Sequence, residues 1–158
     1  MFSSIIISGA LAQDHEFIYP FYRLLEEKSK LDVCLIGGKP VLGILGTTLP
    51  PIKDYPVKDI EDVKVKDYDL LVLPGGVKAL EKTRQNKKFI KFISDFHKAG
   101  KVIACICSGV QLLISAKVVE GKKIAGYYHL EDDIVNAGAI YTDMPAVVDN
   151  KIITTAQR

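Results

Sequence analysis

The stretch Val102-Ile-Ala-Cys-Ile-Cys-Ser-Gly109 decides how this chain folds. Its first five residues form an apolar run, which predicts a buried strand that ends just before Cys107. Residues 110–116 are apolar at helical spacing, so a helix follows the strand almost at once. This abrupt turn has the geometry of a nucleophile elbow, which needs small residues two positions before and two after the nucleophile. Cys105 and Gly109 occupy those positions around Cys107.

Short apolar runs alternate with helical patterns on both sides of this segment. Strands are expected at Ser4 to Ser8, Val33 to Ile36, Leu70 to Leu73, Val102 to Ile106, Ile140 to Thr142, Val147-Val148 and Ile152 to Thr154. Helices are expected at Glu16 to Lys28, Lys87 to Ala99, Val110 to Ala116 and Leu130 to Asn136. Lys39 to Asp67 indicates an irregular hairpin plus a connector. The alternation predicts an α/β domain with a mainly parallel sheet and with ligands at the carboxyl ends of its strands.

Length and composition restrict the classes of protein that the chain can belong to. Its 158 residues suit one domain, 1–158, and 48% hydrophobic with 25% charged residues is typical of a globular protein. The net charge of +2 gives no reason to expect a nucleic-acid or membrane partner. No apolar run approaches a membrane span and no signal peptide is visible, so we expect a cytoplasmic protein.

Cys107 is the candidate nucleophile. Amide groups at the start of the following helix would favour its thiolate and make it a target of oxidation as well. The alternative interpretation is a small buried residue at the end of a strand. Cys34 and Cys105 are expected to pack in the core, and three cysteines without an export signal do not suggest a disulfide framework.

Two further segments are expected beside this cysteine. Gly75 and Gly76 follow a buried strand, and their amides, together with that of Ser108, would stabilise an oxyanion formed when Cys107 attacks a carbonyl. Glu16 opens the helix after the first strand, at the same sheet edge, and is the candidate acid or base. The alternative role for Glu16 is a favourable interaction with the helix dipole.

The histidines and the remaining polar motifs give weaker signals. His15-Glu16 begins like a zinc-protease motif, but Tyr19 stands where the second histidine is needed. Cys105 and Cys107 have no further ligand pair at a useful spacing, so no metal and no organic cofactor are expected. His129 follows two tyrosines and either overhangs the site or is an ordinary surface residue.

Several blocks, in order, resemble the ThiJ/PfpI superfamily over nearly the whole chain. They are Glu16-Phe-Ile-Tyr-Pro20, Tyr68-Asp-Leu-Leu-Val-Leu-Pro-Gly-Gly76, Gly100-Lys-Val-Ile-Ala-Cys-Ile-Cys-Ser-Gly109, Asn136-Ala-Gly-Ala139 and Val147-Val-Asp-Asn-Lys-Ile-Ile-Thr154. The resemblance implies a flavodoxin-like three-layer α/β/α sandwich of the class I glutamine amidotransferase-like type. It further implies Cys107 as the reactive cysteine, Glu16 as the acid that contacts it, and the Gly76 and Ser108 amides as oxyanion donors.

The chain also departs from the family pattern. PfpI-type peptidases carry a histidine directly after the cysteine, where this chain has Ser108. The leading expectation is therefore a cysteine enzyme acting on reactive carbonyls, like the glyoxalase and deglycase relatives of the Parkinsonism-associated protein, with a small carbonyl compound or a glycated protein as substrate. The alternatives are an oxidation-sensing or chaperone-like stress protein without turnover, and a PfpI-type peptidase or amide hydrolase.

The final segment differs from the family as well. Family members usually place a helix after the last strand, whereas this sequence ends at Thr155-Ala-Gln-Arg158. An uncovered apolar sheet face is unfavourable. We therefore expect either a truncated chain or a face covered by a partner subunit, in a homodimer or higher oligomer as is usual in the family.

Overall fold

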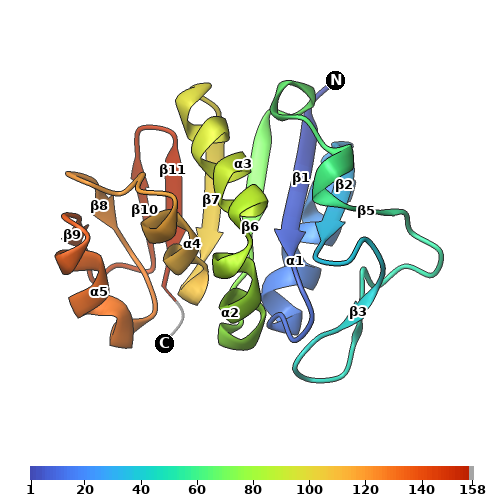
Figure 1. Ribbon diagram of the computed structural model, residues 1–158, viewed down its shortest axis with the longest axis horizontal. Helices are drawn as coiled ribbons and strands as arrows, with labels where there is room; N and C mark the ends of the chain where they lie inside the picture. Colours follow the sequence, from blue (N-terminus) through green and yellow to red (C-terminus); the bar gives the residue numbers. More distant parts are fainter. Residues whose placement is uncertain (157–158) are drawn as a thin grey trace.

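A seven-stranded sheet forms the centre of the computed structural model, which describes residues 1–156 (Figure 1). In spatial order its strands are β10 (Ala146–Asp149), β11 (Ile152–Thr155), β7 (Val102–Ile106), β6 (Leu70–Leu73), β1 (Ser3–Ser8), β2 (Lys30–Leu35) and β5 (Val57–Lys58). All neighbours pair in parallel except β10 and β11, which form an antiparallel hairpin around Asn150. The mainly parallel sheet is confirmed.

Side chains of alternate residues divide the sheet into two apolar faces. Ile5, Leu71 and Ile103 belong to the core cluster on one face, whereas Ile6 and Val72 belong to the cluster on the other. Figure 1 shows α3 and α4 in front of the sheet and α1 behind it. The predicted α/β/α sandwich is therefore present, because strands with two apolar faces need helices on both.

The helices match the expected ranges with one exception. They are α1 (Asp14–Glu26), α2 (Val77–Gln85), α3 (Lys87–Lys98), α4 (Val110–Ser115) and α5 (Glu131–Asn136), with four 3₁₀ turns at Ile60–Asp62, Val65–Asp67, Cys107–Gly109 and Tyr128–Leu130. Helix α2 was not expected as a separate element. Asn86 separates it from α3, because the Asn86 side chain accepts the amides of Lys88 and Phe89 and caps the second helix.

Two small sheets complete the fold. They are the antiparallel pair β3 (Val41–Leu42) and β4 (Thr48–Leu49), and the parallel pair β8 (Lys123–Ile124) and β9 (Ile140–Tyr141). The first pair is the irregular hairpin expected within Lys39 to Asp67. Among residues 1–156 no helix is long and apolar enough to cross a bilayer.

Candidate active site

Cys107 lies at the junction of β7 and the helical turn that leads into α4. Its φ of +55° is unusual for a residue with a side chain, as expected at a nucleophile elbow. A Cβ on Gly109 would lie 2.6 Å from the Leu73 carbonyl oxygen and 3.1 Å from Cys105 Sγ. The strand and helix backbones are therefore as close as the elbow prediction requires, and only a small residue fits at 109.

Glu16 reaches this junction from the first turn of α1. Its backbone amide is capped by Gln13 Oε1 at 3.1 Å, and its carboxyl oxygen Oε2 accepts the Gly75 amide at 2.7 Å. A Cβ on Gly75 would lie only 2.4 Å from Oε2, so the glycine is needed for this contact. The other oxygen, Oε1, is buried and makes no hydrogen bond of ordinary geometry within residues 1–156. Such an orphaned acceptor favours the protonated carboxyl.

The Glu16 carboxyl and the Cys107 thiol influence each other's ionisation. Burial raises the pKa of Glu16, while hydrogen bonding with Cys107 and Gly75 partly lowers it. Burial and the negative charge of Glu16 raise the pKa of Cys107 to about 12, against the opposing effect of the Ser108 amide and hydroxyl. This direction is the reverse of the expectation that the helix amides alone make a thiolate. Because the pKa of Cys107 is raised to about 12, the thiol keeps its proton across the neutral range, and the ionised form of Glu16 is the acceptor available for it.

The proposed oxyanion donors have unequal availability. The Gly75 amide is occupied by Glu16, so its role here is to hold the carboxyl group rather than an oxyanion. The Gly76 amide donates to Ser108 Oγ at 3.2 Å, a long bond to a hydroxyl that can rotate away. Gly76 has a φ of +105°, and a Cβ there would lie 2.5 Å from the Gln13 amide nitrogen. Gly76 and Ser108 therefore remain the candidate oxyanion donors.

A pocket of about 410 Å³ surrounds the cysteine. It is lined by Gln13, Glu16, Ile44, Gly76, Val77, Lys78, Cys107, Ser108 and Tyr127. Sequence reasoning did not find Gln13, Ile44, Lys78 and Tyr127, because they come from loops and helix ends without a pattern of their own. His129 is exposed and does not line the pocket; its ring lies 4.6 Å from that of Tyr127.

Comparison with known proteins agrees with this geometry. Residues 3–158 match the model of the DJ-1/PfpI family. The chain belongs to the DJ-1/PfpI family. Deglycase PfpI of Pyrococcus furiosus is 34% identical over 96% of this chain and 87% of that protein. General stress protein 18 of Bacillus subtilis is 33% identical over 92% of this chain and 82% of that protein. The resemblance inferred from the sequence is thus confirmed.

A solved structure supports the fold of this DJ-1/PfpI protein. Drosophila melanogaster DJ-1beta superposes with a TM-score of 0.88 and 24% identity, over 99% of this chain and 83% of that chain. At this level of identity the similarity concerns the fold alone. It places the elbow of the present chain within a known architecture of parallel strands and flanking helices.

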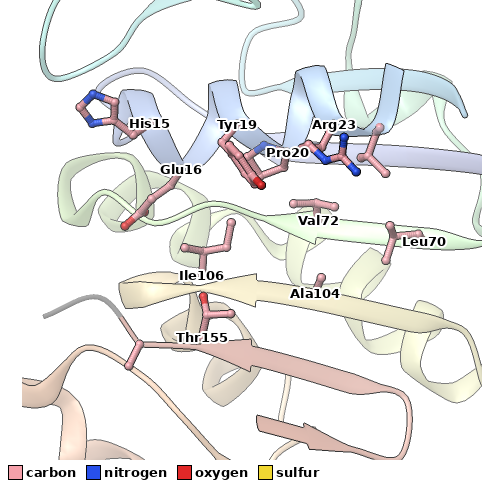
Figure 2. A pocket seen from close by; sticks show the side chains of 12 residues that line it. His15, Glu16, Tyr19, Pro20, Arg23, Leu70, Val72, Ala104, Ile106 and Thr155 are labelled. Atoms are coloured by element: carbon pink, nitrogen blue, oxygen red, sulfur yellow. The ribbon is translucent and has the colours of Figure 1, made fainter. Parts of the chain in front are cut away.

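Glu16 also borders a second cavity of this family member, whose lining does not include Cys107. This groove of about 520 Å³ lies on the α1 face of the sheet, and Figure 2 shows it between α1 and the strands β6, β7 and β11. Its walls are mostly apolar and include Val72, Ala104 and Ile106. His15 lines this groove and not the cysteine pocket.

The other two thiols lie apart from this chemistry. Cys34 and Cys105 are buried and unpaired, and burial raises the pKa of each. Both therefore pack in the core, as predicted. No cluster of three or more metal-binding side chains occurs within residues 1–156.

Proposed function

We propose that this DJ-1/PfpI protein is a cysteine-dependent enzyme that acts on reactive carbonyls, as a glyoxalase or deglycase. The observation that carries the proposal is the Glu16–Cys107 pair: a cysteine with a positive φ is hydrogen-bonded to a buried acid whose Oε2 is held by Gly75. This pair can move a proton at the reacting carbon without any other group. The name of the Pyrococcus relative, a deglycase, supports the same class of chemistry.

The first step forms a bond between the nucleophile and the substrate. With methylglyoxal, Glu16 takes the thiol proton and the Cys107 sulfur bonds to the aldehyde carbon. The carbonyl electron pair moves to oxygen, where the Gly76 and Ser108 amides stabilise the charge until Glu16 returns the proton. The product is a hemithioacetal. Rotation of the Ser108 hydroxyl frees the Gly76 amide for this contact.

The later steps are balanced within the substrate. Glu16 removes the hydrogen of the former aldehyde carbon as a proton, and the ketone carbon is protonated in turn, which gives a lactoyl thioester. One carbon is oxidised and its neighbour reduced, so no external oxidant is required. Water then cleaves the carbon–sulfur bond, releasing lactate and the free Cys107 thiol. On a glycated amine, the thiol would attack the corresponding sugar-derived carbonyl.

The pocket favours this chemistry over peptide hydrolysis. A Cys-His peptidase needs an imidazole beside the thiol. Ser108 follows the cysteine, His129 is exposed, and His15 lies in the other cavity. A peptidase or amide hydrolase would require a histidine from a neighbouring subunit.

Oxidation sensing is the second candidate function. Cys107 is 9% exposed, and a sulfinate there would lie among a buried acid and the Gly76 and Ser108 amides. The similarity to a general stress protein supports this candidate. A gain of two oxygens on Cys107 after mild peroxide treatment, in a protein that makes no lactate, would favour it over the enzyme.

The deciding experiment measures lactate formed from methylglyoxal in an amine-free buffer. We expect the wild type to form lactate and Cys107→Ser to form none, because serine lacks the acidity of a thiol. Cys34→Ser is the matched control, since Cys34 is buried in the core outside the pocket. Equal turnover by Cys107→Ser and the wild type would overturn the proposal.

A further inference from the structure

A short loop, residues 43–47 at the tip of the β3–β4 hairpin, lies against the start of α1. Its backbone is tied to that segment at several points. The Ile44 amide donates to the Ala12 carbonyl at 2.9 Å, and the Leu11 amide donates to the Leu42 carbonyl at 2.8 Å. Both partners lie in the segment that leads into Gln13 and Glu16, so the loop rests on the same backbone that carries the catalytic acid.

Asp14 makes the strongest attachment of this loop. The side chain is 2% exposed, and its two oxygens accept the Leu45 amide at 2.8 Å and the Thr47 amide at 3.0 Å. Hydrogen bonds to a charged acceptor are stronger than neutral ones. These bonds outweigh the effect of burial and hold the pKa of Asp14 below its ordinary value, so the carboxylate is charged at neutral pH.

Gly43 permits this attachment. A Cβ at that position would lie 2.4 Å from the Asp14 carboxyl, closer than real Cβ atoms approach any neighbour. The following residue, Ile44, lines the pocket around Cys107 at its exposed rim, since it is 53% exposed. Asp14 itself does not line the pocket, so any influence on the reaction passes through the loop.

We propose that Asp14 is a positioning residue: by holding the 43–47 loop it places Ile44 as a wall of the pocket and limits the size of electrophiles that reach Cys107. The inference rests on the proposed function in taking Cys107 as the nucleophile. It deepens that function by assigning small carbonyls, rather than bulky ones, as the substrates of the pocket that Ile44 borders.

The test compares two alkylating agents with the same reactive group, iodoacetamide and the much larger 5-iodoacetamidofluorescein. Mass spectrometry locates the modified cysteine. In Asp14→Asn one carboxylate oxygen is replaced by the NH₂ group of asparagine. Either the Leu45 or the Thr47 amide then has no acceptor at that position. We expect the ratio of bulky to small alkylation rates at Cys107 to rise roughly tenfold, the factor that corresponds to about 1.4 kcal/mol. Amide exchange at Leu45 and Thr47 should quicken in the same variant.

Two further variants make the test independent of folding and of turnover. Asp59→Asn is the matched control, because Asp59 also accepts a backbone amide, that of Ile60, away from the pocket, and its ratio should match the wild type. Ile44→Ala removes the wall itself and should raise the ratio. If Ile44→Ala raises the ratio and a folded Asp14→Asn does not, the positioning role is wrong.

The remaining outcomes are equally decisive. If neither variant changes the ratio, Ile44 is not a size limit and the inference falls. If Asp14→Asn accelerates both reagents equally, Asp14 acts on the thiol and not through the loop, which also overturns it. If the ratios change as expected but the wild type makes no lactate, the positioning role stands and the proposed enzymatic function fails.

Discussion

Asp14 and Glu16 are two buried carboxyl groups on the first turn of one helix, yet their surroundings differ. Asp14 has an amide donor for each oxygen, from Leu45 and Thr47. Glu16 accepts the Gly75 amide on Oε2 and is hydrogen-bonded to the Cys107 thiol, while its buried Oε1 makes no hydrogen bond of ordinary geometry within residues 1–156. The pKa of Asp14 is lowered and that of Glu16 is raised. Burial raises the pKa of both groups, and the opposing hydrogen bonds outweigh it at Asp14 but not at Glu16.

This difference in hydrogen bonding and pKa distinguishes a structural carboxylate, Asp14, from a candidate reactive one, Glu16. A buried charge with every acceptor satisfied stabilises the fold that surrounds it. A buried acid with a free oxygen has a proton to exchange, at some cost in stability, which is the pattern of a functional site. In the proposed function, Asp14 shapes the pocket and Glu16, two residues later in the sequence, takes part in the chemistry.

The largest expected effect is on turnover in Glu16→Gln. The amide can still accept the Gly75 hydrogen bond, but it cannot take a proton from the thiol or the substrate. We expect lactate formation to fall by about 10²- to 10⁴-fold, the usual contribution of a general acid or base. The rate of lactate formation by Asp14→Asn should fall far less in the same assay. Comparable losses in both variants would erase the distinction between the two carboxyl groups.

Alanine variants of Gly75 and Gly43 test how closely these glycines approach the carboxyl groups of Glu16 and Asp14. A Cβ on Gly75 or on Gly43 would lie 2.4 Å from the carboxyl group of Glu16 or Asp14, respectively. Each alanine variant should lose up to about 3 kcal/mol of unfolding free energy in urea, the cost of overpacking. Gly75→Ala should also lose turnover, whereas Gly43→Ala should mainly relax size selectivity.

Gly9→Ala is the matched control for these two variants. A Cβ on Gly9 would lie 3.7 Å from the Ile36 side chain, an ordinary contact, and its φ is not in the left-handed region. Its unfolding free energy should stay close to that of the wild type. If Gly43→Ala or Gly75→Ala is as stable as Gly9→Ala, the corresponding carboxyl group is not held as tightly as the structure indicates.

Stability should change in opposite directions when the two carboxyl groups are removed. The lowered pKa of Asp14 means that its contribution is fully present above the ordinary value of 3.8 and is lost as pH falls through the folded pKa. Asp14→Asn should therefore cost about 2 kcal/mol at pH 7, in line with one hydrogen bond to a charged group. This loss should shrink in acid.

Removal of the Glu16 carboxyl group should raise the unfolding free energy instead of lowering it. Burial raises its pKa, so ionisation of Glu16 costs unfolding free energy as pH rises through the folded pKa. Glu16→Gln removes this cost and should be about 1 kcal/mol more stable than the wild type at pH 7, a common trade of stability against activity. Urea unfolding at pH 7 and pH 4 measures both effects, and a destabilised Glu16→Gln would contradict the assignment.

The charge of Glu16 should also be visible in the pH dependence of the thiol. Burial and, after it, the charge of Glu16 raise the pKa of Cys107 to about 12. Removing the charge moves thiol ionisation to lower pH, so Glu16→Gln should be alkylated by iodoacetamide at pH 10 about tenfold faster than the wild type, if the pKa falls by about one unit. Asp14→Asn should leave this pH profile in place. An unchanged profile in Glu16→Gln would show that the two groups are not coupled.

Much of this fold was predictable because its strands are buried on both faces. Leu70–Leu73 and Val102–Ile106 are continuous apolar runs bounded by turn residues, and both are observed with the expected limits. The elbow followed from Cys105 and Gly109, since their spacing is a steric requirement of the turn. Helix α2 was missed because its nine residues are mainly polar and it begins directly after Gly76.

The walls of the site were less predictable, for a physical reason. Ile44 and Tyr127 reach the pocket through loops held by long-range hydrogen bonds, and such contacts leave no periodic pattern in the sequence. The role of Asp14 depends on donors 31 and 33 residues away. The direction of the Cys107 pKa shift depends on the charge of Glu16, which comes from another element altogether.

The smallest expected effect concerns Ser108, whose hydroxyl accepts the Gly76 amide at 3.2 Å. In Ser108→Ala the Gly76 amide loses this partner but keeps its position, because the Gly76 backbone packs closely against Gln13. The amide is then free for the oxyanion without displacing a hydroxyl, while the backbone amide of residue 108 is unaltered. We expect the lactate rate to change by no more than about threefold, well below the loss of an oxyanion donor, at about 10²-fold. A 10²-fold loss in Ser108→Ala would mean that the hydrogen bond between the Ser108 hydroxyl and the Cys107 thiol is needed for turnover, and the division between Glu16 as proton carrier and the amides as charge stabilisers would have to include it.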